Sequence, residues 1–183
     1  MKAFPWLGAV VLCGLGCSST PPANWVKGGA ALEIPRARWV FGSSVVEILP
    51  DGHVLANGEP VMSVDRGGRV FDEDREPIAL LEPDGRVVGP DEEALGVVGA
   101  EHASKPEEEN AWLSVAQSGE VIVYNDEGER MAAGVWIGCN GSARAHQVCT
   151  LVTHLMALKM RALAERSEPS VGIGIGIGVG VGR

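Results

Sequence analysis

A short motif that recurs about every 17 residues between residues 45 and 98 places the strongest constraint on the fold. Glu59-Pro60-Val61 returns as Glu76-Pro77-Ile78 and, in a weaker form, as Glu93-Ala94-Leu95, each time 17 residues later. A fixed spacing of this kind indicates one supersecondary unit that is copied in tandem. Because a unit of this length cannot bury an apolar face alone, the copies must pack on one another or on another element.

Turn signals and short apolar runs alternate within each copy. The first turn signal is Asp51-Gly52, Gly67-Gly68 or Asp84-Gly85, and such pairs favour tight hairpins of type I′, in which both central residues have positive φ. The apolar runs between the turns, such as Val45 to Leu49 and Ile78 to Leu81, are typical of strands. We therefore expect an antiparallel β-meander that curls into a small roll or sandwich, with a short β-solenoid as the alternative.

The chain after the repeats predicts a loop and then more strands. Residues 99–110 are polar and acidic and contain a proline, so we interpret them as an exposed loop. Three further apolar runs, at 112–117, 120–124 and 131–137, are separated by turn residues and predict three more strands.

One clear helix is predicted from Ser142 to Arg166. Apolar residues recur at helical spacing along it, the hydroxyl group of Ser142 can cap its first turn, and Pro169 cannot continue it. We expect the helix to cover the open face of the β-meander, with an interfacial or partner-binding helix as the alternative. The predicted fold class is therefore α+β, mainly β with one C-terminal helix packed on a sheet of 17-residue repeats.

The first sixteen residues are typical of an export signal. Lys2 is followed by an uncharged and mostly apolar stretch that is too short to span a bilayer as a permanent helix. The stretch ends in Gly14-Leu15-Gly16-Cys17, which resembles the lipobox of bacterial lipoprotein precursors. The resemblance implies cleavage before Cys17 and acylation of that cysteine, for example with palmitate, as a membrane anchor. By that family's sorting rule, Ser18 favours the outer membrane of a diderm bacterium.

The sequence thus divides into four parts. After the signal peptide of residues 1–16, we expect a lipidated tether over 17–38, a β-repeat domain with its C-terminal helix over 39–166, and a low-complexity tail over 167–183. The tail alternates glycine with isoleucine or valine, and glycine at every second position disfavours order without a partner. The alternative is a strand that adds to a sheet edge or that oligomerises.

Two thiols remain once Cys13 leaves with the signal peptide and Cys17 carries lipid. They are Cys139 and Cys149, ten residues apart across a glycine-rich turn and the start of the helix. An even number of cysteines in an oxidising compartment favours a disulfide between them. Two buried free thiols or a metal pair are the alternatives, and the lack of a C-x-x-C spacing argues against the metal pair.

The net charge of −9 is unevenly distributed, because residues 39–137 hold 21 Asp or Glu against 6 Lys or Arg. A surface this acidic repels phosphate, so we predict that the chain does not bind nucleic acid. We expect the acidic groups to form a solvated face that keeps the domain soluble. Binding of a divalent cation or a basic partner is the alternative.

The sequence contains no pattern that predicts catalysis. His146 and His154 are eight residues apart on the predicted helix, which is too loose for a metal pair, and His53 and His102 fall in a turn and in the acidic loop. We expect these histidines to be surface residues rather than ligands. Nucleophile-elbow, zinc-protease and P-loop motifs are absent from the sequence. We therefore predict no catalytic residue, no metal site and no cofactor.

These features favour an envelope lipoprotein with a structural or binding role, which holds an envelope protein partner through its β-surface or its helix. The alternative is a hydrolase of cell-envelope material that uses carboxylates of the acidic β-region. Such a hydrolase needs two carboxylates that face each other across a cleft and have unequal pKa values. We favour the binding role because the acidic residues fall in turns, where Asp and Glu are common anyway.

Overall fold

The structure, a computed structural model, describes residues 20–125 and 127–167. The predicted signal peptide, the lipidation site Cys17 and residues 168–183 of the predicted tail lie outside this part. Within it, twelve strands form a barrel wall, and each strand pairs antiparallel with the next one in the sequence. The elements are β1 (Ala37–Phe41), β2 (Ser44–Ile48), β3 (His53–Ala56), β4 (Glu59–Val64), β5 (Arg69–Phe71), β6 (Pro77–Leu81), β7 (Arg86–Val88), the 3-10 turn η1 (Pro90–Glu92), β8 (Ala94–Val98), β9 (His102–Ser104), β10 (Ala111–Val115), β11 (Glu120–Tyr124), β12 (Arg130–Ile137) and α1 (Ala143–Ser167).

The barrel closes because its first and last strands pair with each other. In this β1–β12 pair, Trp39 lies opposite Trp136 and Val40 lies opposite Val135. The prediction of a mainly β fold with one C-terminal helix is confirmed, whereas the prediction of an open meander or roll is wrong. Closure pairs the backbone groups that an open meander would leave exposed along its two edge strands.

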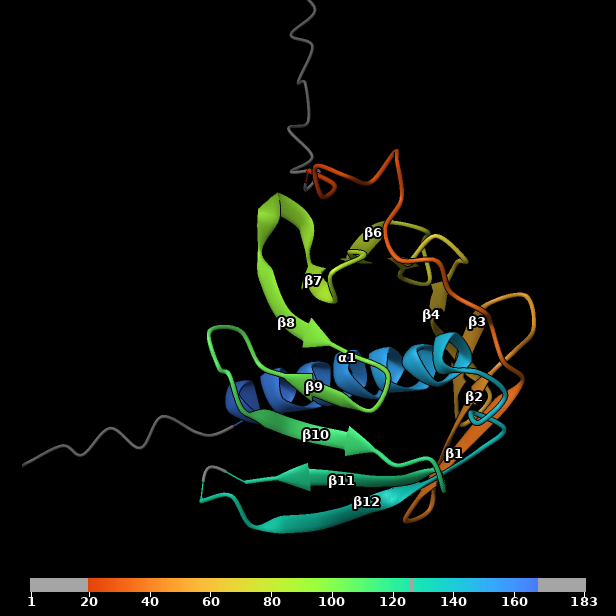
Figure 1. Cartoon of the computed structure of the whole chain (residues 1–183), viewed down its shortest axis with the longest axis vertical. Coiled ribbons are helices and arrows are strands. Elements are labelled where there is room, and N and C mark those ends of the chain that lie inside the picture. The colour runs from red at the N-terminus through yellow and green to blue at the C-terminus, as the bar shows by residue number, and fades with distance from the viewer. Residues whose placement is uncertain (1–19, 126, 168–183) are drawn as a thin grey trace, which may run out of the picture.

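Helix α1 runs through the interior of the barrel, with strands around it (Figure 1). Nine consecutive residues, Val148–Met156, are buried, so this part of the helix is covered on every side. The same apolar core contains this stretch and the inward-facing residues of the wall. The expectation that the helix covers an open sheet face is therefore wrong. A helix with one apolar stripe can lie on a sheet, but a helix inside a barrel has no solvent face.

Most hairpin loops of the repeat region share one geometry. Each contains a four-residue turn in which the N–H of the fourth residue donates to the carbonyl oxygen of the first. Among the described residues of these turns, only the fourth has positive φ. Asp51 and Asp84 precede the glycine without positive φ themselves, so the prediction of type I′ turns at these pairs is wrong and the turns are type I. Both residues have positive φ in Asn57-Gly58 and in Asp91-Glu92. In the described chain the fourth position is occupied by Gly52, Gly68, Arg75, Gly85, Gly119 and Gly128.

Residues 20–36 lie against the barrel. The N–H of Ala30 donates to the carbonyl of Leu81 in β6 over 2.7 Å, and Ala30 is buried. Leu80, on the outer face of β6, is fully buried beneath this segment. This part of the expected 17–38 tether therefore packs as part of the folded domain.

The expected loop over residues 99–110 contains a strand. Strand β9 pairs with β8 on one side and with β10 on the other, so the loop prediction is wrong for His102–Ser104. The wall needs this short strand because a gap between β8 and β10 would open the barrel. At the start of α1, the hydroxyl of Ser142 accepts a hydrogen bond from the N–H of Ala145 over 3.1 Å, which confirms the predicted cap.

Candidate functional site

A chain of hydrogen bonds crosses the barrel interior from β10 through α1 to β8. The indole N–H of Trp112 donates to Nδ1 of His154 over 2.9 Å, and Nε2 of His154 donates to the carbonyl of Leu95 over 2.7 Å. The imidazole therefore accepts at one nitrogen and donates at the other, which fixes a single neutral tautomer. Burial lowers the pKa of His154 to about 4, so the ring is uncharged at neutral pH.

Gly96 of β8 makes room for this imidazole. Its φ is +117°, and a Cβ atom at this position would lie 2.2 Å from the carbonyl oxygen of Ser104. The same Cβ would lie 3.1 Å from the ring of His154. Glycine therefore serves two purposes here, since it adopts the left-handed backbone and lets the helix approach the wall closely.

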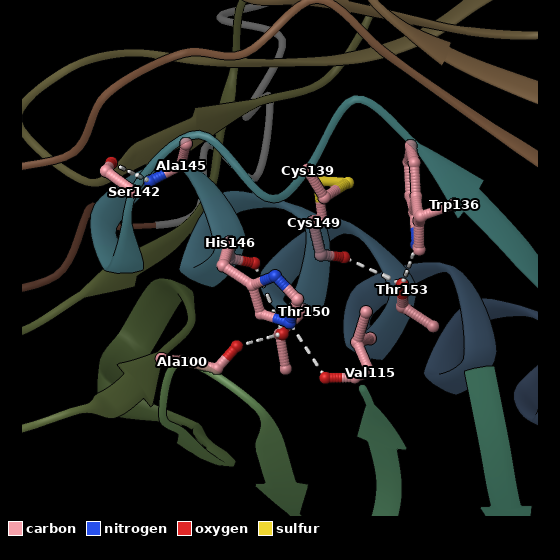
Figure 2. Close-up of a disulfide and its surroundings, with 10 residues drawn as sticks. All are labelled: Ala100, Val115, Trp136, Cys139, Ser142, Ala145, His146, Cys149, Thr150 and Thr153. Carbon is pink, nitrogen blue, oxygen red and sulfur yellow. Dashed lines mark hydrogen bonds between the residues drawn. A yellow bond between two sulfur atoms is a disulfide. The ribbon is translucent and has the colours of Figure 1, made fainter. Parts of the chain in front are cut away.

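Two polar side chains in the N-terminal half of α1 bond to backbone carbonyls of the wall (Figure 2). Nε2 of His146 donates to the carbonyl of Val115 over 2.8 Å, and the hydroxyl of Thr150 donates to the carbonyl of Ala100 over 2.6 Å. Buried polar groups need such partners, because an unpaired group loses its hydration without compensation. These bonds therefore allow polar residues to occupy the centre of the barrel.

A disulfide between Cys139 and Cys149 joins the segment after β12 to the helix (Figure 2). Both cysteines are buried. Beside the disulfide, the indole N–H of Trp136 donates to the hydroxyl oxygen of Thr153 over 2.8 Å. The hydroxyl of Thr153 in turn donates to the carbonyl of Cys149 over 2.7 Å. The predicted cysteine pair therefore lies within a group of contacts that attach α1 to the end of β12.

The histidines do not all lie where the sequence places them. His53 and His102 are exposed, as expected, but His146 and His154 are buried, so the expectation of surface residues is wrong for these two. The reason is that the barrel surrounds the part of the helix that carries them. Among the residues that the structure describes, no group of three or more His, Cys, Asp or Glu side chains could hold a metal ion.

The carboxylates of the hairpin loops have a structural role. Asp51 and Asp84 each accept a hydrogen bond from the backbone N–H two residues later. That backbone N–H, from His53, holds the pKa of Asp51 below its ordinary value, and the side chain of Arg86 does the same for Asp84. These carboxylates stabilise their own turns, as expected for Asp at such positions.

A hollow of about 610 Å³ lies at the end of the barrel where α1 emerges, and we call it the mouth hollow. The β9–β10 connection, the β11–β12 turn and the C-terminal half of the helix surround it. These three segments gather at one end of the barrel (Figure 1). The residues that line it are Lys105, Glu108, Asn110, Ala111, Trp112, Tyr124, Asn125, Gly128 and Arg161.

The mouth hollow combines cationic, amide and aromatic groups. Nζ of Lys105 lies 3.0 Å from the carboxylate of Glu108 and 5.9 Å from the ring centre of Trp112. Arg161 adds a guanidinium from the helix, and Tyr124 is the single tyrosine of the chain. A concave site with a few polar groups of this kind can bind a small polar ligand. Trp112 also donates to His154, so one residue belongs to both the hollow and the interior hydrogen-bond chain.

No helix within the described residues is long and apolar enough to cross a membrane. Comparisons with models of protein families, with curated proteins and with solved structures find no match for this chain. Its function is therefore inferred from its own residues.

Sequence reasoning does not bring the residues of the mouth hollow together. Lys105 precedes Tyr124 by 19 residues, and Arg161 follows Tyr124 by 37 residues. The one feature of the sequence that could have drawn attention to this site is Tyr124, because it is the only tyrosine in the sequence. Which loops meet at one end depends on the number and direction of the strands before them, and the sequence does not show this number.

Proposed function

We propose that the chain is a lipid-anchored binding protein of the bacterial cell envelope, with no catalytic role, and that it binds a small polar ligand in the mouth hollow. The binding role is supported by one observation: the barrel interior is occupied by α1, and the mouth hollow lies outside it. Because α1 occupies the barrel centre over Val148–Met156, ligand binding falls to the outside of the domain. The closed wall and the buried Cys139–Cys149 disulfide favour a preorganised site, which lowers the entropic cost of binding.

The proposed anchor rests on the sequence. Gly14-Leu15-Gly16-Cys17 resembles a lipobox, and the polar run that follows suits a short tether between a lipid and the domain. A disulfide between Cys139 and Cys149 is consistent with export, because disulfides persist in oxidising compartments.

The intact mass of the protein from the membrane fraction of its host tests the anchor. We expect cleavage before Cys17, added acyl chains, and two hydrogens fewer than the reduced form because of the Cys139–Cys149 bond. The mass of an uncleaved chain with free thiols would contradict both the export and the lipid anchor. A Cys17→Ser variant, which removes the acceptor thiol, is expected to lose the acyl mass.

The side chains of the mouth hollow favour a ligand with an acidic group. Lys105 and Arg161 can donate charge-assisted hydrogen bonds to a carboxylate or phosphate, and the amides of Asn110 and Asn125 can complete its polar contacts. Glu108 also lines the hollow and accepts a hydrogen bond from Lys105, so an acidic ligand would compete with this carboxylate for the lysine.

NMR titration with soluble acidic saccharides and peptides from cell-envelope digests tests the site. We expect shifts of the Trp112 indole N–H and of the Asn110 and Asn125 side-chain amides. Arg161→Gln should reduce the affinity, and Arg144→Gln at the other end of the same helix is the matched control. Equal effects of the two variants, or shifts confined to other resonances, would contradict a ligand site in the mouth hollow.

A further inference from the structure

The outer face of β1, β2 and β12 carries several apolar side chains that lie next to one another. Val40 of β1 lies directly between Val135 of β12 and Val45 of β2, and all three point away from the interior. Ile137, two positions beyond Val135, has 64% of its surface exposed. The tryptophans between these outward residues point inward, so the alternation of a barrel strand is kept while its solvent side is apolar.

Two outward arginines on other strands contrast with this face. Arg69 on β5 and Arg86 on β7 point outward, and each pairs with a carboxylate of its own hairpin loop. Exposed apolar residues that lie singly, such as Val97 between Arg86 and Ser104, need no explanation, whereas apolar residues gathered on one face are candidates for an interface. We therefore treat Val40, Val45, Val135 and Ile137 as one surface, together with the adjacent Arg38 and Glu47, and call it the β1–β12 face.

The β1–β12 face has a projecting side chain beside two hollows. Ile137 projects between two hollows of about 290 Å³ each and contributes to the lining of both. Trp136 and Asn140 belong to the hollow on one side, and Arg36 and Leu49 belong to the hollow on the other. A projecting side chain beside a hollow can insert into the same hollow of a second copy when a two-fold axis relates the copies.

The charges of the face also match those of a second copy. Arg38 and Glu47 are register partners on the outward side of β1 and β2, yet the described structure contains no ion pair between them. With one cation and one carboxylate, the face is locally neutral, whereas the chain as a whole carries −9. Copies of this chain therefore repel one another least at this face, where Arg38 of each can meet Glu47 of the other.

We propose that the β1–β12 face is a self-association surface through which two copies of this chain form a symmetric dimer. The outer side of three short strands covers roughly 15 by 17 Å, so two copies bury less than the roughly 1,200 Å² of a standard interface. The dimer is therefore weak and forms in proportion to concentration. This surface is separate from the mouth hollow, and the proposal does not depend on ligand binding or on the lipid anchor.

Sedimentation velocity over the micromolar concentration range tests the dimer, with the whole chain carrying Cys17→Ser throughout so that no lipid is attached. The unmodified face should give a sedimentation coefficient that rises with concentration. Ile137→Glu should weaken the association by about tenfold or more, because it places a carboxylate at the centre of the contact. Val97→Glu is the matched control, because Val97 on β8 is also exposed, with 44% of its surface accessible. This variant should associate as the parent protein does.

A charge exchange keeps the proposal testable should Ile137→Glu disturb folding. Arg38→Glu and Glu47→Arg should each weaken the dimer by several-fold, and the double variant should restore it, because the two opposite charges meet again across the two-fold axis. A parent chain that stays monomeric at every concentration would overturn the proposal and indicate that a different molecule binds this face. Equal losses for Ile137→Glu and Val97→Glu, or no recovery in the double variant, would also overturn it.

Discussion

The two sides of the barrel hold the central helix in different ways. Strands β8 to β12, which we call the polar wall, bond to α1 through His146, Thr150, Thr153 and His154 and reach it through the disulfide. Strands β2 to β7, which we call the apolar wall, contribute buried aliphatic side chains to the same core. Five side-chain hydrogen bonds link α1 to strands of the polar wall.

The difference between the walls separates two requirements of a helix in a barrel. Apolar burial depends on the area removed from water and has little directional preference, so the apolar wall stabilises the helix without choosing its rotation. Hydrogen bonds require both distance and angle. The polar wall therefore sets how α1 is rotated and how far it is inserted, and changes to the two walls should have different consequences.

The largest expected effect comes from closing the gap between the helix and the polar wall. Gly96→Ala places a Cβ 2.2 Å from the carbonyl oxygen of Ser104 in β9 and 3.1 Å from the ring of His154 in the helix, at a φ of +117°, and we expect a loss of about 4 kcal/mol or a failure to fold. Urea unfolding measures this change. Gly58→Ala is the control, because Gly58 also has positive φ but has open space around it, and it should cost only about 1 kcal/mol. Similar losses for both variants would show that strain, not helix contact, dominates.

Removing the covalent link tests whether the hydrogen bonds alone can hold the helix. The double variant Cys139→Ala with Cys149→Ala opens a loop of ten residues, and we expect a loss of about 3 kcal/mol in the free energy of unfolding. Urea unfolding with and without reductant measures it. The parent protein should lose stability in reductant, while the double variant should not respond. A parent protein that is insensitive to reductant under unfolding conditions would contradict a stabilising role of the disulfide.

Acid should weaken the polar wall selectively. The pKa of His154 is about 4 in the folded protein against 6.5 for an ordinary histidine, so the unfolded chain binds this proton more readily. The contribution is complete above pH 6.5 and is lost as the pH falls towards 4, by up to about 3 kcal/mol. Stability measured against pH should therefore slope more steeply in the parent protein than in His154→Gln.

A variant of the apolar wall provides the contrast for this pH experiment. Val54→Ala removes buried aliphatic atoms from β3 and should cost about 2 kcal/mol at every pH between 4 and 7. Its stability curve should run parallel to that of the parent protein. A steeper or flatter curve would indicate that the two walls are not independent.

The smallest expected effect concerns a turn of the repeat region. Arg75 occupies, with a φ of +67°, the loop position that glycine occupies in the neighbouring hairpins. Arg75→Gly removes the strain of a left-handed backbone at a residue with a Cβ, and we expect a gain of up to about 1 kcal/mol. Thermal unfolding should show a small increase in Tm. A decrease would indicate that the arginine side chain stabilises the loop by more than its backbone costs.

The repeat region was the most predictable part of the molecule, because its signals are local. The apolar runs Val45 to Leu49 and Ile78 to Leu81 correspond to strands β2 and β6, and Ser142 correctly marked the start of the helix. The turn type was predicted incorrectly because an Asp-Gly pair occurs in two kinds of hairpin loop. One is a two-residue loop with a type I′ turn, and the other is a three-residue loop with a type I turn. The two loops differ in backbone pairing around the pair, and composition does not show that pairing.

The burial of His146 and His154 and the residues of the mouth hollow could not be predicted in this way. A histidine on a helix is usually found at the surface, and only the surrounding wall turns these two into interior residues. The same holds for Lys105 and Arg161, which line one hollow because the barrel brings a hairpin connection and the helix end together.

The sequence by itself indicated the helix, several strands and turn positions, and it favoured the pairing of Cys139 with Cys149, because these depend on residues close together in the chain. The tertiary structure alone decided that the sheet closes and that the helix lies inside it. Closure depends on the total number of strands and on the pairing of β1 with β12, whose paired residues are 95 to 99 positions apart. No local pattern carries that information, and the mouth hollow and the β1–β12 face both follow from it.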